Sequence, residues 1–221
     1  MSLPTIAPYP LPTSEELPEN RAHWPLEPER ALLLVHDMQR YFVRPYAEGS
    51  QPIAGAVANI AALRSACRAA GVPVVYTAKP GDMTSEQRGL ERDFWGAGMK
   101  AVAEHTDIVP ELAPDDEDLL LTKWRYSAFA QTDLAERMAA QGRDQIVVTG
   151  VYAHIGCQLT AADAFMRDIR PFLIADALAD FSADHHRSAL SYAAGRCATV
   201  LSTRDALDFL DQGADSTGAR P

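Results

Sequence analysis

Apolar residues along the chain fall into short continuous runs, separated by stretches in which they recur every three or four residues. Runs of four to eight residues are typical of strands buried on both faces, and the wider spacing is typical of amphipathic helices. The runs predict strands at 30–37, 72–77, 119–123, 145–149, 172–175 and 198–201, and the spacing predicts helices at 53–67, 132–141, 154–168, 185–196 and 203–210. Strands that alternate with helices predict an α/β fold with three layers, a doubly wound, six-stranded parallel sheet carrying helices on both faces.

The two ends of the chain and one internal segment lack this alternation. Prolines crowd residues 1–28, which excludes a helix or an interior strand and predicts an N-terminal proline-rich arm, packed on the surface or on a partner. Residues 29–212 are expected to form a single domain, and 213–221 a flexible tail with nothing to bury. The excursion at 82–114 is long enough to be a functional lid or to contain short helices.

Composition narrows the class of protein. The 221 residues are 47% hydrophobic and 23% charged, as in ordinary globular proteins, and no apolar stretch reaches the roughly 18 residues that span a membrane. A formal net charge of −10 argues against nucleic acid as a partner, and an anionic small substrate would need local cations. The N-terminus lacks a secretory signal, and three cysteines cannot all pair, so we expect a cytoplasmic protein with reduced thiols.

Three of the predicted strands end in residues that can carry chemistry. Asp37 follows the first strand, Lys123 follows the third, and a glycine-containing turn at 150–157 follows the fourth. Reactive groups gather beyond the carboxyl ends of parallel strands, so an acid, an ammonium and a turn rich in backbone N–H groups are expected in one crevice. Taken singly, Asp37 is equally a helix N-cap and Lys123 a surface lysine, but their convergence favours a pocket.

Several segments together resemble the isochorismatase-like cysteine hydrolase superfamily. They are 34–42, 87–90, 93–96, 123–129, 150–156 and 175–182. The resemblance covers nearly the whole chain and implies the isochorismatase-like hydrolase fold, a homodimer, and no cofactor. No metal is expected, because His36, His154, His185 and His186 show no ligand spacing with a third ligand at hand.

The position of the nucleophile is the main departure from the superfamily's amidases. Their catalytic cysteine corresponds to Gly156 in this chain, and Cys157 comes one residue later. One step along a helix turns a side chain by about 100°, so Cys157 is expected to be a small buried residue instead. A Cys157-dependent amidohydrolase and a non-catalytic binding subunit are the alternatives. Asp37, Lys123 and Arg88 weigh against the second of these.

An acid and a cation without a thiol suit the cleavage of a vinyl ether. The resemblance implies release of pyruvate from isochorismate or 2-amino-2-deoxyisochorismate in secondary metabolism, in a siderophore, phenazine or related pathway. As a hypothesis, Asp37 protonates the enolpyruvyl methylene, Lys123 anchors a substrate carboxylate and holds Asp37, and Gly156 leaves room for the substrate. The choice of substrate stays open, as does the protonation state of Asp37, whose pKa a nearby lysine lowers.

The resemblance also implies substrate contacts outside the catalytic group, from Phe42, Lys79, Arg88, Trp95 and Tyr152. Arg88 suits a carboxylate because a guanidinium binds it with two parallel hydrogen bonds, although an arginine in a polar loop is commonly solvated. Phe42 and Trp95 are equally suited to a core. Lys79 stands where close relatives carry glutamine, so it either touches the anionic substrate or points to solvent. The resemblance further implies a cis peptide bond between Val151 and Tyr152.

Overall fold

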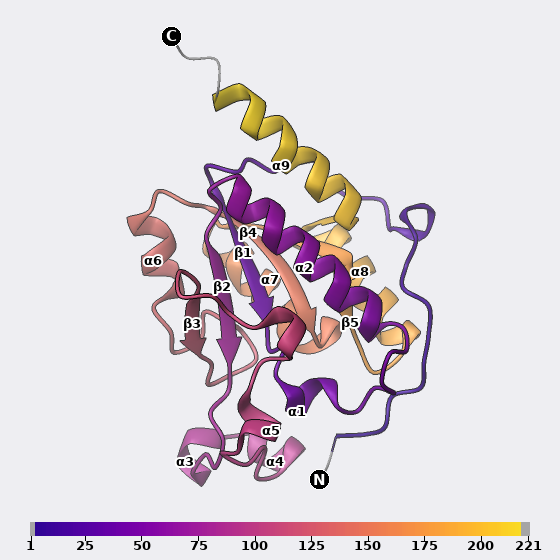
Figure 1. The fold of residues 1–221 in the computed structure, drawn as a ribbon, viewed down its shortest axis with the longest axis vertical. Helices are drawn as coiled ribbons and strands as arrows, with labels where there is room; N and C mark the ends of the chain where they lie inside the picture. The colour runs from indigo at the N-terminus through magenta and orange to yellow at the C-terminus, as the bar shows by residue number, and fades with distance from the viewer. Residues whose placement is uncertain (1–2, 218–221) are drawn as a thin grey trace.

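The computed structural model describes residues 3–217, with side chains to residue 211, and consists of one parallel sheet between two layers of helices (Figure 1). The sheet has the order β3-β2-β1-β4-β5-β6, and all neighbouring strands are parallel. The strands are β1 (Ala31–His36), β2 (Val74–Ala78), β3 (Leu119–Thr122), β4 (Gln145–Val151), β5 (Arg170–Ala179) and β6 (Thr199–Leu201). This arrangement confirms the predicted fold class.

Each face of the sheet packs against its own set of helices. On one face lie α2 (Ile53–Ala69) and α9 (Thr203–Thr217), and on the other lie α6 (Leu134–Ala140), α7 (Gln158–Met166) and α8 (Ala183–Arg196). Successive side chains of a strand point to opposite faces, so Leu33 of β1 joins the first hydrophobic cluster and Leu32 the second. Burial on both faces explains the continuously apolar sequence of β1, whereas the edge strand β3 is partly exposed, with Leu120 at 54% exposure.

Several element boundaries differ from the prediction, and the largest differences are in β5, in the helix after β4 and in α9. β5 continues to Ala179 instead of ending at Ala175, because the carboxylate of Asp176 accepts hydrogen bonds from the backbone N–H and hydroxyl of Thr203 and is thereby tolerated within the strand. The helix expected at 154–168 begins with a π-helical turn, η3 (Ala153–Cys157).

α9 runs to Thr217, past the expected end at Leu210, so residues 213–217 of the predicted tail are helical. Gly213 weakens a helix without interrupting its hydrogen bonds, which is why its presence did not end α9. The rest of the predicted tail, 218–221, lies outside the described residues. The domain boundaries at 28/29 and 212/213 stay a prediction.

Short helices fill the excursion at 82–114, as expected. They are α3 (Ser85–Arg88), α4 (Glu91–Trp95), α5 (Ala103–Thr106) and the 3-10 turn η2 (Pro110–Leu112). We call residues 82–114 the lid. Another short helix, α1 (Arg40–Val43), was not predicted. The buried amide of Gln39, next to α1, donates to the carbonyls of Lys79 (2.9 Å) and Thr106 (2.8 Å) and so ties the base of the lid to the end of β1.

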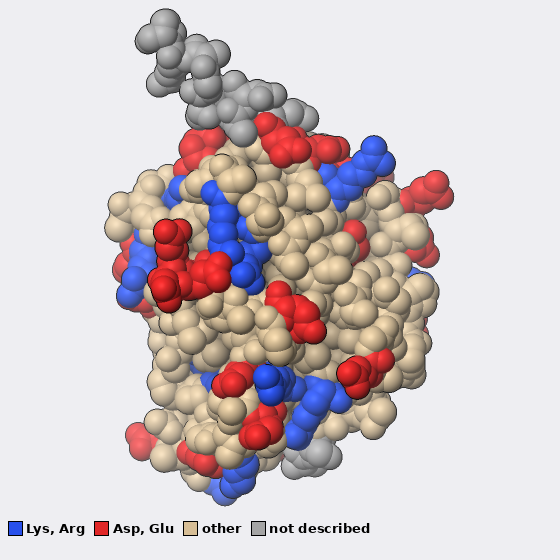
Figure 2. Space-filling model, in the orientation of Figure 1, with Lys and Arg blue, Asp and Glu red and all other residues tan. Residues whose placement is uncertain are grey.

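Charged side chains of both signs are interspersed on the face shown in Figure 2, without a continuous basic surface there. An anion that approaches this face therefore meets no extended positive potential. Among the described residues, no helix combines the length and apolar character that crossing a membrane requires.

The N-terminal arm packs on the domain itself. Ile6 and Leu26 are buried in the core, and the backbone N–H of Ile6 donates to the carbonyl of Pro45. The hydroxyl of Tyr9 accepts a hydrogen bond from the backbone N–H of Asp180 (2.7 Å) and lies 3.2 Å from Nδ1 of His186. The arm is therefore joined to the end of β5 through one phenol.

Replacing Tyr9 with phenylalanine tests this attachment. The change leaves the buried N–H of Asp180 without its partner, so we expect the free energy of unfolding to fall by about 1–3 kcal/mol. Chemical denaturation followed by circular dichroism measures the change. The control is Tyr192→Phe, because Tyr192 is 48% exposed, and it should change stability little. Equal stability of the two variants would contradict the assigned role of the Tyr9 hydroxyl.

Candidate active site

A pocket opens at the carboxyl ends of the central strands and is roofed by the lid. β1 and β4 are neighbours in the sheet, but the chain continues from β1 to β2 on one side and from β4 to β5 on the other. Open α/β sheets bind ligands at such a reversal of strand order. The pocket has a volume of about 720 Å³, including its open mouth. Its lining includes all eight residues expected at the site: Asp37, Phe42, Lys79, Arg88, Trp95, Lys123, Tyr152 and Gly156.

Asp37 is buried directly after β1, with a left-handed backbone conformation (φ 53°) that is uncommon outside glycine. Its Oδ2 lies 2.7 Å from Nζ of Lys123, and its Oδ1 accepts a hydrogen bond of 2.7 Å from the hydroxyl of Thr77. Burial favours the neutral carboxyl, but the nearby cations, led by Lys123, outweigh burial and lower the pKa of Asp37 below its ordinary value. The free site therefore holds a carboxylate.

Lys123 is almost fully buried at the end of β3, so it is not a lysine that reaches solvent. Besides its ion pair with Asp37, its ammonium donates to the backbone carbonyl of Tyr126 (3.2 Å). The ammonium is thus fixed beside the acid, at the place expected for it.

Gly156 lies against the imidazole of His36, the last residue of β1. A Cβ atom at position 156 would lie 2.7 Å from Nε2 of His36 and closer still to its Cε1. The ring cannot easily move, because Nδ1 is 2.8 Å from the carbonyl oxygen of Val151 and the side chain is buried. We expected the missing side chain to make room for a substrate, but on the Cβ side that space is filled by His36.

His36 is neutral near pH 7. Burial is the main reason that its pKa falls to about 4, and the charge of Lys123 adds to the effect. A neutral imidazole donates through only one nitrogen. The shorter contact, with Val151, is the better candidate for that hydrogen bond.

Cys157 faces away from the pocket. Its side chain is fully buried in the cluster between the sheet and the helices α6, α7 and α8. Burial raises the pKa of the Cys157 thiol well above its ordinary value, so the thiolate is strongly disfavoured there. The expectation of a small buried residue is confirmed, and the described lining of the pocket contains no cysteine.

Buried charges from the lid and from Lys79, which directly follows β2, form the opposite wall. Nζ of Lys79 lies 2.7 Å from Oε2 of Glu91, and Nη1 of Arg88 lies 3.3 Å from the same oxygen. Burial, followed by the charge of Lys123, lowers the pKa of Lys79 to about 8, and Glu91 opposes this shift. Arg88 also donates through Nε to the carbonyl of Gly96 (3.2 Å). Both cations are buried in the pocket wall, so neither is a solvated surface residue.

Aromatic rings form the remaining wall. Tyr152 packs edge-on against Phe42 and lies 4.3 Å, between ring centroids, from Phe181. Its hydroxyl donates to the backbone carbonyl of Phe42 (2.7 Å). Trp95 lies 6.1 Å from Phe181, between ring centroids, and donates from Nε1 to the hydroxyl of Tyr126. The Val151–Tyr152 peptide bond is cis, as the resemblance implied.

Further residues belong to the site but were not predicted there: His36, Thr77, Glu91, Tyr126 and Phe181. Thr77 pairs with His36 in the sheet, and strand-end reasoning applied to β2 would have found it. Glu91 left no comparable signal, because it lies in a polar segment without periodicity.

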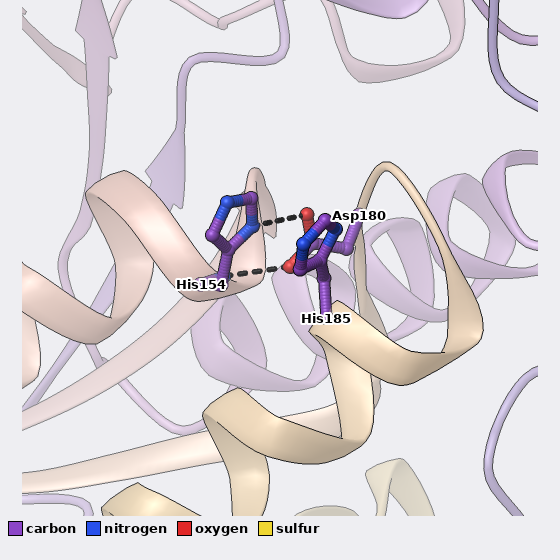
Figure 3. Close-up of side chains that lie close together, drawn as sticks. All are labelled: His154, Asp180 and His185. Carbon is purple, nitrogen blue, oxygen red and sulfur yellow. Dashed lines mark hydrogen bonds and ion pairs between the residues drawn. The ribbon is translucent and has the colours of Figure 1, made fainter.

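His154, Asp180 and His185 lie close together beside the turn, with one potential metal-ligand atom from each within 4.8 Å of the others (Figure 3). The two imidazole rings are stacked at 4.4 Å and nearly parallel, with an interplanar angle of 14°. An imidazole binds a metal in its own plane, so parallel rings do not direct their lone pairs to one point. Asp180 instead accepts hydrogen bonds from the backbone N–H groups of His154 and Phe181 and so holds η3 in place.

Comparisons with known proteins identify the family of this chain. Residues 31–205 match the family described as "Isochorismatase domain". The phenazine biosynthesis protein PhzD1 of Pseudomonas aeruginosa is 58% identical over 93% of this chain and 99% of its own. The isochorismatase of Bacillus subtilis is 50% identical over 95% of this chain and 67% of its own.

Among solved structures, a cysteine hydrolase from Pseudomonas syringae pv. phaseolicola superimposes with a TM-score of 0.79. Its sequence identity is 26%, and the match covers 91% of this chain and all of the other. The family match, the sequence identities and the shared fold thus point the same way. The chain belongs to the isochorismatase family of hydrolases.

Proposed function

We propose that this protein hydrolyses the vinyl ether of isochorismate or of its 2-amino-2-deoxy analogue and releases pyruvate. The observation that carries the proposal is the buried Asp37–Lys123 pair in a pocket whose described lining has no cysteine. The names of the relatives, an isochorismatase and a phenazine biosynthesis protein, support the same substrate class. The expected homodimer and cytoplasmic location stay predictions.

In the proposed mechanism, protonated Asp37 gives its proton to the terminal methylene carbon of the enolpyruvyl group. The C=C electron pair forms the new C–H bond, and the cation that results is shared with the ether oxygen as an oxocarbenium ion. Water adds to the cationic carbon and returns a proton to Asp37. The hemiketal then collapses to pyruvate and the ring alcohol, so no covalent enzyme intermediate and no thiol is needed.

Asp37 must acquire its proton when the substrate binds, because in the free site Lys123 favours the carboxylate. A substrate carboxylate that pairs with Lys123 weakens its hold on Asp37 and adds a second negative charge nearby. Both effects raise a carboxyl pKa, as does the exclusion of water by the aromatic wall. The bound substrate thereby favours the protonated form of Asp37, which acts as its general acid.

Asp37→Asn tests the general acid. Asparagine tolerates the left-handed backbone conformation of this position but cannot give up a proton, so turnover should fall by about 10²- to 10⁴-fold. Pyruvate release is followed with lactate dehydrogenase, using both substrates. Asp93→Asn is the control, because Asp93 is exposed in the lid, and it should keep wild-type turnover. Near-normal activity of Asp37→Asn would exclude the proposed acid, and an inactive wild-type protein would exclude the proposed function.

The pH dependence provides a second test. In the free enzyme the protonated form of Asp37 becomes rarer as the pH rises, so kcat/KM should fall by about tenfold per pH unit between about pH 5 and about pH 8. Bound substrate raises the pKa of Asp37, so kcat should hold its value to a higher pH than kcat/KM. Both profiles come from the coupled assay. A value of kcat/KM that stays constant or rises over this range would contradict the assignment.

Gly156→Ala tests the contact with His36. The added methyl group overlaps the imidazole, so we expect a loss of about 1–3 kcal/mol in the free energy of unfolding, together with lower turnover. Thermal unfolding and the coupled assay measure the two effects. Gly195→Ala is the matched control, because a Cβ atom there meets nothing within 4 Å, and it should be neutral or stabilising. Removing the imidazole as well, in His36→Ala/Gly156→Ala, should recover part of the stability lost by Gly156→Ala.

A further inference from the structure

Glu91 is a buried acidic residue of the pocket wall to which the proposed mechanism gives no role. It is the first residue of α4 and is 6% exposed. Lys79 and Arg88 both approach the same carboxylate oxygen, Oε2. The other oxygen, Oε1, is buried and has no hydrogen-bond partner in the part of the chain that the structure describes. A buried carboxylate oxygen of this kind is a strong hydrogen-bond acceptor that lacks a hydrogen-bond donor.

Glu91 also changes the charge that a substrate meets. Lys79, Arg88 and Lys123 are the cations of the described pocket lining, and Asp37 and Glu91 are its carboxylates. Removal of Glu91 would leave the lid side of the pocket purely cationic, which suits a substrate that carries only negative charges. With Glu91 present, the same wall offers cations for carboxylates and, beside them, one anion for a positive group.

We propose that Glu91 is a specificity-determining residue, which favours a substrate with an ammonium group over the otherwise identical hydroxyl compound. This inference rests on the proposed function. The two candidate substrates differ at one ring carbon, which carries a hydroxyl in one and an amino group in the other. A hydrogen bond between two charged groups is about twice as strong as one between neutral groups, and burial strengthens the attraction further.

The carboxylate can reach such a group without a change in the fold. Glu91 lines the pocket, and the terminal torsion of a glutamate side chain is broad, so its carboxylate can turn toward a new donor, at the cost of loosening the contacts of Oε2 with Lys79 and Arg88. An ammonium that enters the pocket supplies the donor that Oε1 lacks. Lys79 and Arg88 remain available to carboxylates of the same substrate.

The test compares the two substrates in the wild type, in Glu91→Gln and in the conservative variant Glu91→Asp. The readout is the ratio of kcat/KM for the amino compound to that for the hydroxyl compound, measured by coupled pyruvate release. We expect the wild type to prefer the amino compound. Glu91→Gln, which keeps the shape and removes the charge, should lower the ratio by about tenfold or more, chiefly through KM for the amino compound. Glu91→Asp should keep a preference for the amino compound.

The control is Glu86→Gln, because Glu86 is an exposed acidic residue of the neighbouring helix α3, and its ratio should equal that of the wild type. A ratio is insensitive to partial unfolding, since both substrates meet the same preparation. A wild type that prefers the hydroxyl compound, or an equal loss on both substrates in Glu91→Gln, would overturn the inference while the proposed function stands. Absence of pyruvate from both substrates with the wild type would remove both.

Discussion

The ion pair between Asp37 and Lys123 constrains the ends of three strands at once. β2 lies between β1 and β3 in the sheet, so Lys123 reaches Asp37 across the end of β2, where Thr77 donates to the same carboxylate. Two buried charges cost several kcal/mol each in lost hydration, and only close pairing with further hydrogen bonds offsets that cost. The register of the three strands and the burial of the pocket are therefore coupled.

Sequence patterns predicted the parts of this arrangement that depend on local periodicity. Asp37 and Lys123 were found because continuous apolar runs lead up to them, and the rotation of one helical step placed Cys157 in the core. Contacts between distant segments left no such pattern. The packing of His36 against Gly156 depends on the pairing of β1 with β4, and the burial of Glu91 depends on how the lid folds over the strand ends.

Asp180 connects three regions that are far apart in the sequence. Its carboxylate holds the first turn of η3, and its backbone N–H is held by Tyr9 of the N-terminal arm. The next residue, Phe181, packs against Tyr152 in the pocket. The arm therefore supports the site from behind, although the described arm residues that line the pocket are limited to Leu3. If the arm were loosened, Asp180 would transmit the change to the pocket residues that pack beside it.

The contact between His36 and Gly156 has a consequence for how such pockets can change. A thiol placed at position 156 needs a Cβ atom, and that atom would collide with a ring held by the carbonyl of Val151. Conversion to a cysteine hydrolase by stepwise mutation would thus be easiest if residue 36 became smaller before a cysteine was introduced at position 156. Packing between two residues that are far apart in the sequence therefore favours one order of substitutions over the other.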